Sequence, residues 1–352
     1  MSEKIKKGAE VEGKRGAITQ RRSTAAIVVK WEDEETKARP ADPRPSIEIQ
    51  ERGDIFFFYR PKVDKEEAHG AKDLQRFYLL LRPYSGQTQV EEKQDPNSGK
   101  EGAKRRLANH HEIETNTHQH HEQGGGHGSH PVNIKKQPLL RLIVMGRKSL
   151  PDPSKKTTPY WGFVEMITTE IEHVKAALRG EEYDTATKGH RHLPDSRAVG
   201  EGVYRILKHN PGSRSMHTHL VYKLEFPTEG EEEEPQKALN IARQASFLLQ
   251  IKNPDQRASQ FRGLEKKRKA AFPAHLQGLF GHRRYHPADP PDLLNYEGCE
   301  FLLVSASDDI EQELGLELKT TEQLQDAACS NLIKTFGETA AATRPLFQGT
   351  WV

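Results

Sequence analysis

The feature that most limits how this chain can fold is a series of short apolar runs that are rich in β-branched and aromatic residues. Two of them end in Arg-Pro, at Arg60-Pro61 and Arg82-Pro83. Proline has no N–H to donate to a β-ladder, so a strand stops there. The runs cover residues 55–59, 77–81, 139–145, 160–167, 200–208, 216–226, 246–252 and 301–304. Their length and composition predict strands rather than helices.

Helix patterns are fewer and shorter. One helix is predicted from Thr169, a capping residue, with Glu172 three residues later and Gly180 to end it. The other predicted helices follow Pro273, Ser307 and Thr320. We therefore predict an α+β fold with a strand-rich, mainly antiparallel sheet or barrel-like core and three or four short helices.

Three polar stretches divide the chain. Residues 1–46 are rich in charge and proline and predict a flexible N-terminal tail. Residues 84–137 lack apolar periodicity and are rich in Gly and His, which predicts a disordered insertion. Residues 227–237 form an acidic linker. The rest of 47–352 is predicted to be a globular strand-rich domain or a closely packed domain pair.

Charge and cysteine content restrict partner and compartment. The chain has 352 residues and a formal net charge of +2, which favours a protein or a small anionic ligand over nucleic acid as its partner. Its two cysteines, Cys299 and Cys329, lack zinc-ligand spacing and are interpreted as reduced and structural. No signal peptide or membrane-spanning run is recognised. A cytoplasmic or nuclear protein is therefore predicted.

A short basic cluster bears on localisation. It consists of Lys266, Lys267, Arg268 and Lys269. Clusters of this kind are typical of nuclear-localisation segments. The alternative interpretation is a solvated loop inside the domain, because such clusters also arise by chance in a highly charged chain.

Several longer strings occur together: GDIFFFYRPKV (53–63), RLIVMGRKSLP (141–151), GEGVYRIL (200–207), HTH (217–219) and PADPPDLL (287–294). In these strings the chain resembles a plant family with bacterial relatives, often labelled "BTB/POZ domain protein, tumour-necrosis-factor-induced-protein type". The resemblance covers roughly 47–83, 138–226 and 238–352 and implies no particular activity. The BTB fold itself is not expected here, because it is helix-rich and the ordered segments of this chain are predicted strands.

The most suggestive polar residues are His217 and His219, which are two positions apart in the predicted strand 216–226. Side chains alternate along a strand, so the two imidazoles share a face. The opposite, core-facing side consists of Leu220, Tyr222, Leu224 and Phe226. Two imidazoles can supply two ligands to Zn²⁺, but a site needs a third or fourth.

Glu201, Arg205 and His209 are candidates to complete that site, because a turn at 210–213 predicts that 200–208 pairs with this strand. The alternative interpretation is that the two histidines are simply exposed on a strand.

Three strand-end arginines are also candidate ligand-binding residues: Arg60, Arg82 and Arg147. Guanidinium groups bind carboxylate and phosphate well, and these three form an anion pocket if the strand ends coincide. Antiparallel neighbours would separate them instead. Arg205 is a further candidate for contact with a ligand.

No catalytic fingerprint is present: the chain lacks a Gly-x-Ser-x-Gly, a phosphate-binding Gly-rich loop and a His-Glu-x-x-His motif. The sequence therefore favours a non-enzymatic binding or regulatory module with no cofactor other than zinc. The alternative is a metal-assisted or His-dependent enzyme centred on His217 and His219.

Overall fold

The computed structural model describes residues 46–84, 86–91, 129–155, 158–210, 216–228, 234–256, 263–315, 317–318 and 343–352. All of them belong to one compact unit that spans 42–352. The predicted tail up to residue 45, the predicted helix from Thr320 and Cys329 lie outside the described residues.

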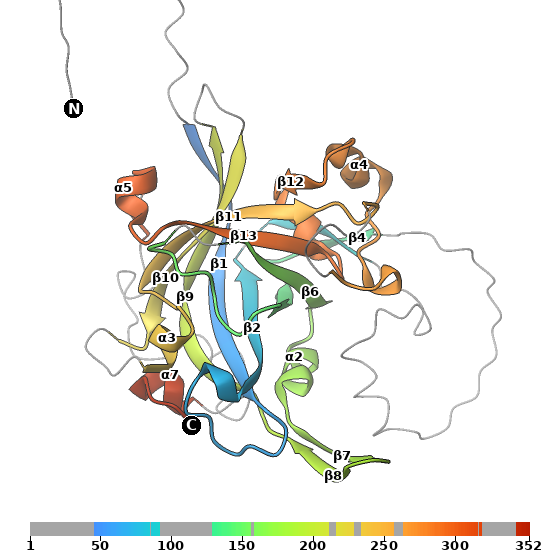
Figure 1. The fold of residues 1–352 in the computed structure, drawn as a ribbon. Helices are drawn as coiled ribbons and strands as arrows, with labels where there is room; N and C mark the ends of the chain where they lie inside the picture. The colour runs from blue at the N-terminus through green and yellow to red at the C-terminus, as the bar shows by residue number, and fades with distance from the viewer. Residues whose placement is uncertain are drawn as a thin grey trace, which may run out of the picture. The chain divides into compact units, whose positions relative to one another are not determined.

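Eight antiparallel strands close into a barrel (Figure 1). In order around it they are β1 (Ser46–Pro61), β2 (Leu74–Pro83), β5 (Leu140–Met145), β6 (Tyr160–Thr168), β13 (Glu300–Ser307), β11 (Gln244–Lys252), β10 (His217–Phe226) and β9 (Arg197–Asn210). The ring is closed by pairing of β10 with β11, from His219 opposite Leu248 to Lys223 opposite Gln244. The prediction of a strand-rich, antiparallel, barrel-like core is confirmed.

Alternate residues of the strands fill the barrel. In β1, Ile55, Phe57 and Tyr59 belong to the main apolar cluster, to which all eight strands contribute, whereas Phe56 and Phe58 point to the outer side. Both faces of β1 are therefore buried between Ile55 and Tyr59. This explains why that part of the strand is an unbroken apolar run rather than an alternation of apolar and polar residues.

Short helices cover parts of the outer surface. The helix α2 (Ile171–Leu178) packs Val174 and Leu178 into the outer cluster that contains Phe56. The helix α5 (Ile310–Leu314) packs Ile310 and Leu314 against Leu207 of β9 and Val221 of β10. This second cover is the one that shapes the histidine site.

The remaining elements surround the barrel. Two separate hairpins are β3 (Gln87–Glu91) with β4 (Ser129–Asn133) and β7 (Glu181–Thr185) with β8 (Gly189–Leu193), and β12 (Tyr285–Pro287) extends β11. The short helices are α3 (Glu234–Ala238), α4 (Ala274–Gln277), α7 (Arg344–Gln348), and the 3₁₀ turns η1 (Ala71–Asp73), η3 (Lys266–Arg268), η4 (Gly278–Phe280) and η5 (Pro291–Asn295). None of the helices formed by the described residues is long and apolar enough to span a membrane.

Three predicted boundaries need correction. The insertion predicted over 84–137 is too wide, because its ends form the β3–β4 hairpin, in which Val90 and Val132 are buried. The linker predicted over 227–237 is also too wide, because α3 buries Pro235 and Gln236. The N-cap of the first helix is Glu170 rather than Thr169, so the predicted start of this helix is one residue too early.

Candidate metal centre

Three histidines meet on the outer face of the β9–β10 hairpin. His209 of β9 lies directly opposite His217 of β10, and His219 is two residues further along β10 on the same face. Antiparallel pairing and strand alternation therefore place all three imidazoles side by side. The prediction that His217 and His219 share a face is confirmed, and the register adds His209.

The three rings form a compact triangle. Their centroids are 4.9 Å apart for His209 and His217, 5.0 Å for His217 and His219, and 5.7 Å for His209 and His219. One ring nitrogen from each residue lies within 4.8 Å of the other two. No other group of three or more His, Cys, Asp or Glu side chains with this geometry is found among the described residues.

The expectation of exposed histidines is wrong for His219, whose relative exposure is 2%. The side chain points away from the barrel interior, as predicted, but α5 covers this part of the outer face together with the apolar residues around Leu207 and Val221. The strand pattern alone could not predict this cover, because α5 lies far from β10 in the sequence. His209 and His217 remain half-buried.

A serine orients His219, and a carboxylate lies next to that serine. Its Nδ1 lies 2.9 Å from the Ser246 hydroxyl oxygen of β11 and 3.7 Å from a carboxylate oxygen of Glu313 in α5. Ser246 also hydrogen-bonds Glu313. Burial raises the pKa of that carboxyl, and the hydrogen bond from Ser246 offsets this effect only in part. With Nδ1 occupied in this way, Nε2 is the nitrogen of His219 that remains for an ion.

Two buried ring nitrogens in this cluster have no hydrogen-bond partner among the described residues: Nδ1 of His209 and Nε2 of His219. A buried polar atom without a partner is costly, and native structures contain few of them. The two unpartnered nitrogens on these neighbouring rings are explained if both coordinate one shared ion.

The protonation of the cluster also suits a metal ion. Burial, and to a smaller extent the neighbouring His217 and His209, lowers the pKa of His219 to about 3. Burial and His217 likewise lower the pKa of His209. Neutral imidazole is the form that binds a metal, so these rings need not lose a proton first.

The predicted arginine pocket does not form, because the β1–β2 ladder is antiparallel and places Arg60 opposite Arg76 but Arg82 opposite Asp54. Arg60 is buried and donates to the carbonyls of Ala177, Arg179 and Pro194, at the end of α2 and beyond. Arg82 is paired with Asp54. Arg60 and Arg82 are thus engaged within the fold.

Arg147 and Arg205 have different surroundings. Arg147 is exposed beside Tyr160, with its guanidinium carbon 4.4 Å from the ring centroid. Arg205 of β9 lies opposite Val221, and its contact with the carbonyl of Glu317 is long, at 3.5 Å. Arg205 is not a member of the histidine triangle.

The basic cluster at 266–269 lies at η3. Arg268 donates to Glu165 at 2.9 Å, and the Lys269 ammonium donates to the carbonyl of Pro254 at 3.1 Å. Two of its four cations are therefore partly held by the fold, whereas Lys266 and Lys267 are exposed. Nuclear access through this cluster stays a prediction.

Sequence reasoning missed Ser246 and Glu313 as parts of the site. Ser246 lies in β11, the strand that follows the hairpin, and Glu313 lies in α5 much later in the chain; neither belongs to a motif that marks it. The comparisons give no independent guide: no family model, no curated protein and no solved structure matches the chain. The family resemblance of the strings described above therefore stays a prediction.

Proposed function

We propose that this protein is a metal-binding module that holds Zn²⁺ through His209, His217 and His219. The observation that carries the proposal is the convergence of three imidazoles from two paired strands, with one nitrogen from each within 4.8 Å of the others. Nitrogens bound to a tetrahedral zinc at about 2.0–2.1 Å lie roughly 3.4 Å apart. Small ring rotations would therefore complete the geometry.

The surroundings of the rings support the same proposal. Metal-bound histidines commonly make a second contact through their other ring nitrogen to a carboxylate or another polar group, which fixes the tautomer and the ring orientation. Ser246 occupies that position at His219, and Glu313 in turn hydrogen-bonds Ser246. Glu313 lies on the Nδ1 side of the ring rather than at Nε2, so we assign it an orienting role through Ser246 and leave the fourth ligand to water.

Metal analysis of the full-length chain tests the proposal. Seven histidines between residues 110 and 130 would bind zinc loosely and obscure the count, so all are first changed to Gln in a common background. In that background we expect a single tightly held zinc per chain, measured by elemental analysis after dialysis and by competition with a chromophoric chelator.

Paired variants identify the ligands. His209→Gln with His219→Gln should lose the stoichiometric zinc, whereas His190→Gln with His192→Gln, which removes two histidines of the β7–β8 hairpin, should keep it. Zinc retained by the first variant, or lost equally from both, would contradict the site. Circular dichroism of each metal-free variant verifies that the fold is intact.

A hydrolytic enzyme is a second candidate, favoured by the ligand count. Structural zinc sites generally have four protein ligands, whereas catalytic sites have three and a water whose pKa falls to about 7. The half-buried His209 and His217 leave the site open on one side. Zinc-dependent hydrolysis of p-nitrophenyl acetate that disappears in the His209→Gln, His219→Gln variant would support this candidate, and its absence would leave the binding module alone.

A further inference from the structure

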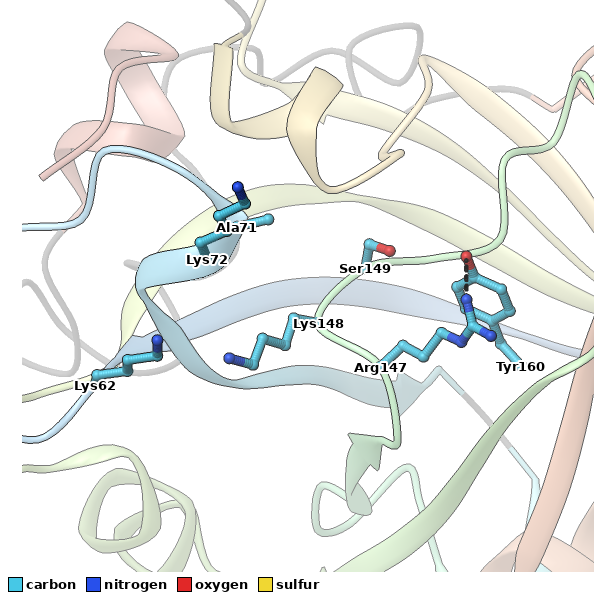
Figure 2. Close-up of a pocket in the computed structure, with 7 residues that line it drawn as sticks. All are labelled: Lys62, Ala71, Lys72, Arg147, Lys148, Ser149 and Tyr160. Carbon is cyan, nitrogen blue, oxygen red and sulfur yellow. Dashed lines mark hydrogen bonds between the residues drawn. The ribbon is translucent and has the colours of Figure 1, made fainter. Parts of the chain in front are cut away.

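A second potential site lies away from the histidines, where the chain leaves β1 and β5. An open, shallow pocket of about 600 Å³ is lined there by Lys62, Ala71, Lys72, Arg147, Lys148, Ser149 and Tyr160 (Figure 2). These residues come from three segments: the residue after β1, the η1 turn, and the segment from the end of β5 to the start of β6. Its volume is in the usual range for small-molecule pockets.

The lining is strongly positive. Four of its seven side chains are cations, and none is acidic. Figure 2 shows Lys148 extending toward Lys62, whereas Arg147 extends the other way to lie against Tyr160. Burial, and then the charge of Lys62, lowers the pKa of Lys148. Two ammonium groups thus face each other without a counter-charge between them.

The nearest carboxylate does not neutralise this group. Asp73 acts on Lys148 only as a weaker, opposing influence, because its own oxygens are bonded to the Lys65 ammonium and to the backbone N–H of His69. Within the described parts of the chain, no side-chain hydrogen bond or ion pair is made by Lys62, Lys72 or Lys148. Their positive charge is available to a ligand.

Backbone contacts hold the segments that carry the cations. The N–H of Lys62 donates to the carbonyl of Asp73 at 2.8 Å, which ties the end of β1 to η1. On the other side, the N–H groups of Gly146 and Leu150 donate to the carbonyls of Trp161 and Leu239 at 2.8 and 2.9 Å. Both ends of the segment that carries Arg147 and Lys148 are therefore fixed, so the backbone keeps the origins of these cationic side chains around the pocket.

We propose that this open pocket binds a small molecule that carries two or more phosphate groups. Four cations around one pocket match clustered negative charge, and lysine and arginine both bind phosphate well. The hydroxyl of Ser149 and the ring of Tyr160 provide further contacts for the remainder of such a ligand. The small net charge of +2 does not favour extended nucleic acid as the occupant. The proposal does not depend on the zinc site.

Calorimetric titration of the full-length protein with sodium tripolyphosphate and with inorganic phosphate tests the proposal. The buffer is treated with a chelating resin, so that no metal at the histidines contributes. We expect saturable binding of tripolyphosphate, weaker binding of single phosphate, and at least tenfold weaker tripolyphosphate binding in Lys62→Gln with Lys148→Gln. The matched control is Lys266→Gln with Lys267→Gln, which removes the same charge at η3 and should bind as the parent does.

Three results would overturn the proposal. They are no saturable binding of tripolyphosphate at millimolar concentration, an equal loss in the control variant, and binding of a single-stranded oligonucleotide through Lys62 and Lys148 without tripolyphosphate binding. Both double variants carry surface substitutions, and an unchanged or slightly raised melting temperature shows that they fold. Removing the repulsion between Lys62 and Lys148 should not lower it.

Discussion

At the scale of single residues, His219 combines burial with a polar environment that suits only its neutral form. Its Nδ1 is held by Ser246, and its pKa is lowered to about 3, mainly by burial. Strand alternation in the sequence predicted which way this side chain points. It could not predict that Ile310 and Leu314, about ninety residues later, would cover it.

This burial predicts how stability depends on pH. In the unfolded chain a histidine takes up a proton near pH 6.5, whereas folded His219 does so only near pH 3. The stability that folding gains from keeping His219 neutral is present in full above pH 6.5. It is lost as the pH falls toward 3, because over that range only the unfolded state gains the proton. For metal-free protein, this group should lower the free energy of unfolding by about 2 kcal/mol at pH 5 relative to neutral pH.

Urea denaturation of metal-free protein between pH 7.5 and 5 measures this loss. His219→Gln should show a flatter pH dependence, because it removes the titrating group. The exposed His69→Gln is the matched control and should keep the parent slope. An identical slope in the parent and in His219→Gln would contradict the burial of His219 as a neutral ring.

At the scale of elements, the β9–β10 hairpin shows what an alternating pattern can and cannot predict. Leu220, Tyr222 and Leu224 face the barrel interior as the sequence predicted. Phe226 does not, because the register shifts between Leu224 and Phe226 and moves it to the outer cluster. A bulge reverses the face of every later residue, and a single sequence carries no reliable mark of it.

The interior face of the hairpin should carry much of its stability. Leu220→Ala removes a side chain that is 4% exposed and should lower the free energy of unfolding by about 2–5 kcal/mol, as core truncations do. Leu279→Ala makes the same chemical change at a partly buried position and should cost less. Equal losses in urea denaturation would show that Leu220 does not occupy the interior.

At the scale of the whole molecule, closure of the barrel explains why the fold class was predictable and its topology was not. Eight short apolar runs bounded by turns indicate antiparallel strands, and closing them leaves no exposed barrel edge. The spatial order is a different matter. β13 lies between β6 and β11, a neighbour relation that depends on interior packing and not on any local pattern.

The same packing explains why the insertion predicted over 84–137 includes the two strands of the β3–β4 hairpin. The β3–β4 hairpin has little apolar content of its own, but its attachment to the rest of the fold is extensive. The amide of Asn295 donates to the Thr88 hydroxyl at 2.6 Å and to the Gln89 carbonyl at 2.8 Å, and Glu91 accepts from the N–H of Glu297 at 2.9 Å. Long-range hydrogen bonds of this kind leave no periodicity in the sequence.

Two replacements distinguish the hairpin from the chain that joins its strands. Exchanging 92–128 for a short Gly/Ser linker should change the free energy of unfolding by no more than about 1–2 kcal/mol, since each halving of loop length alters the closure entropy by only about 0.6 kcal/mol. Exchanging 87–133 should cost several kcal/mol, because Val90 and Val132 leave the core and the buried amide of Asn295 loses two of its three acceptors. Urea denaturation of both variants measures the difference. Equal stabilities would mean that the β3–β4 hairpin contributes nothing to the fold, and a large loss from the first replacement alone would place that contribution in 92–128 instead.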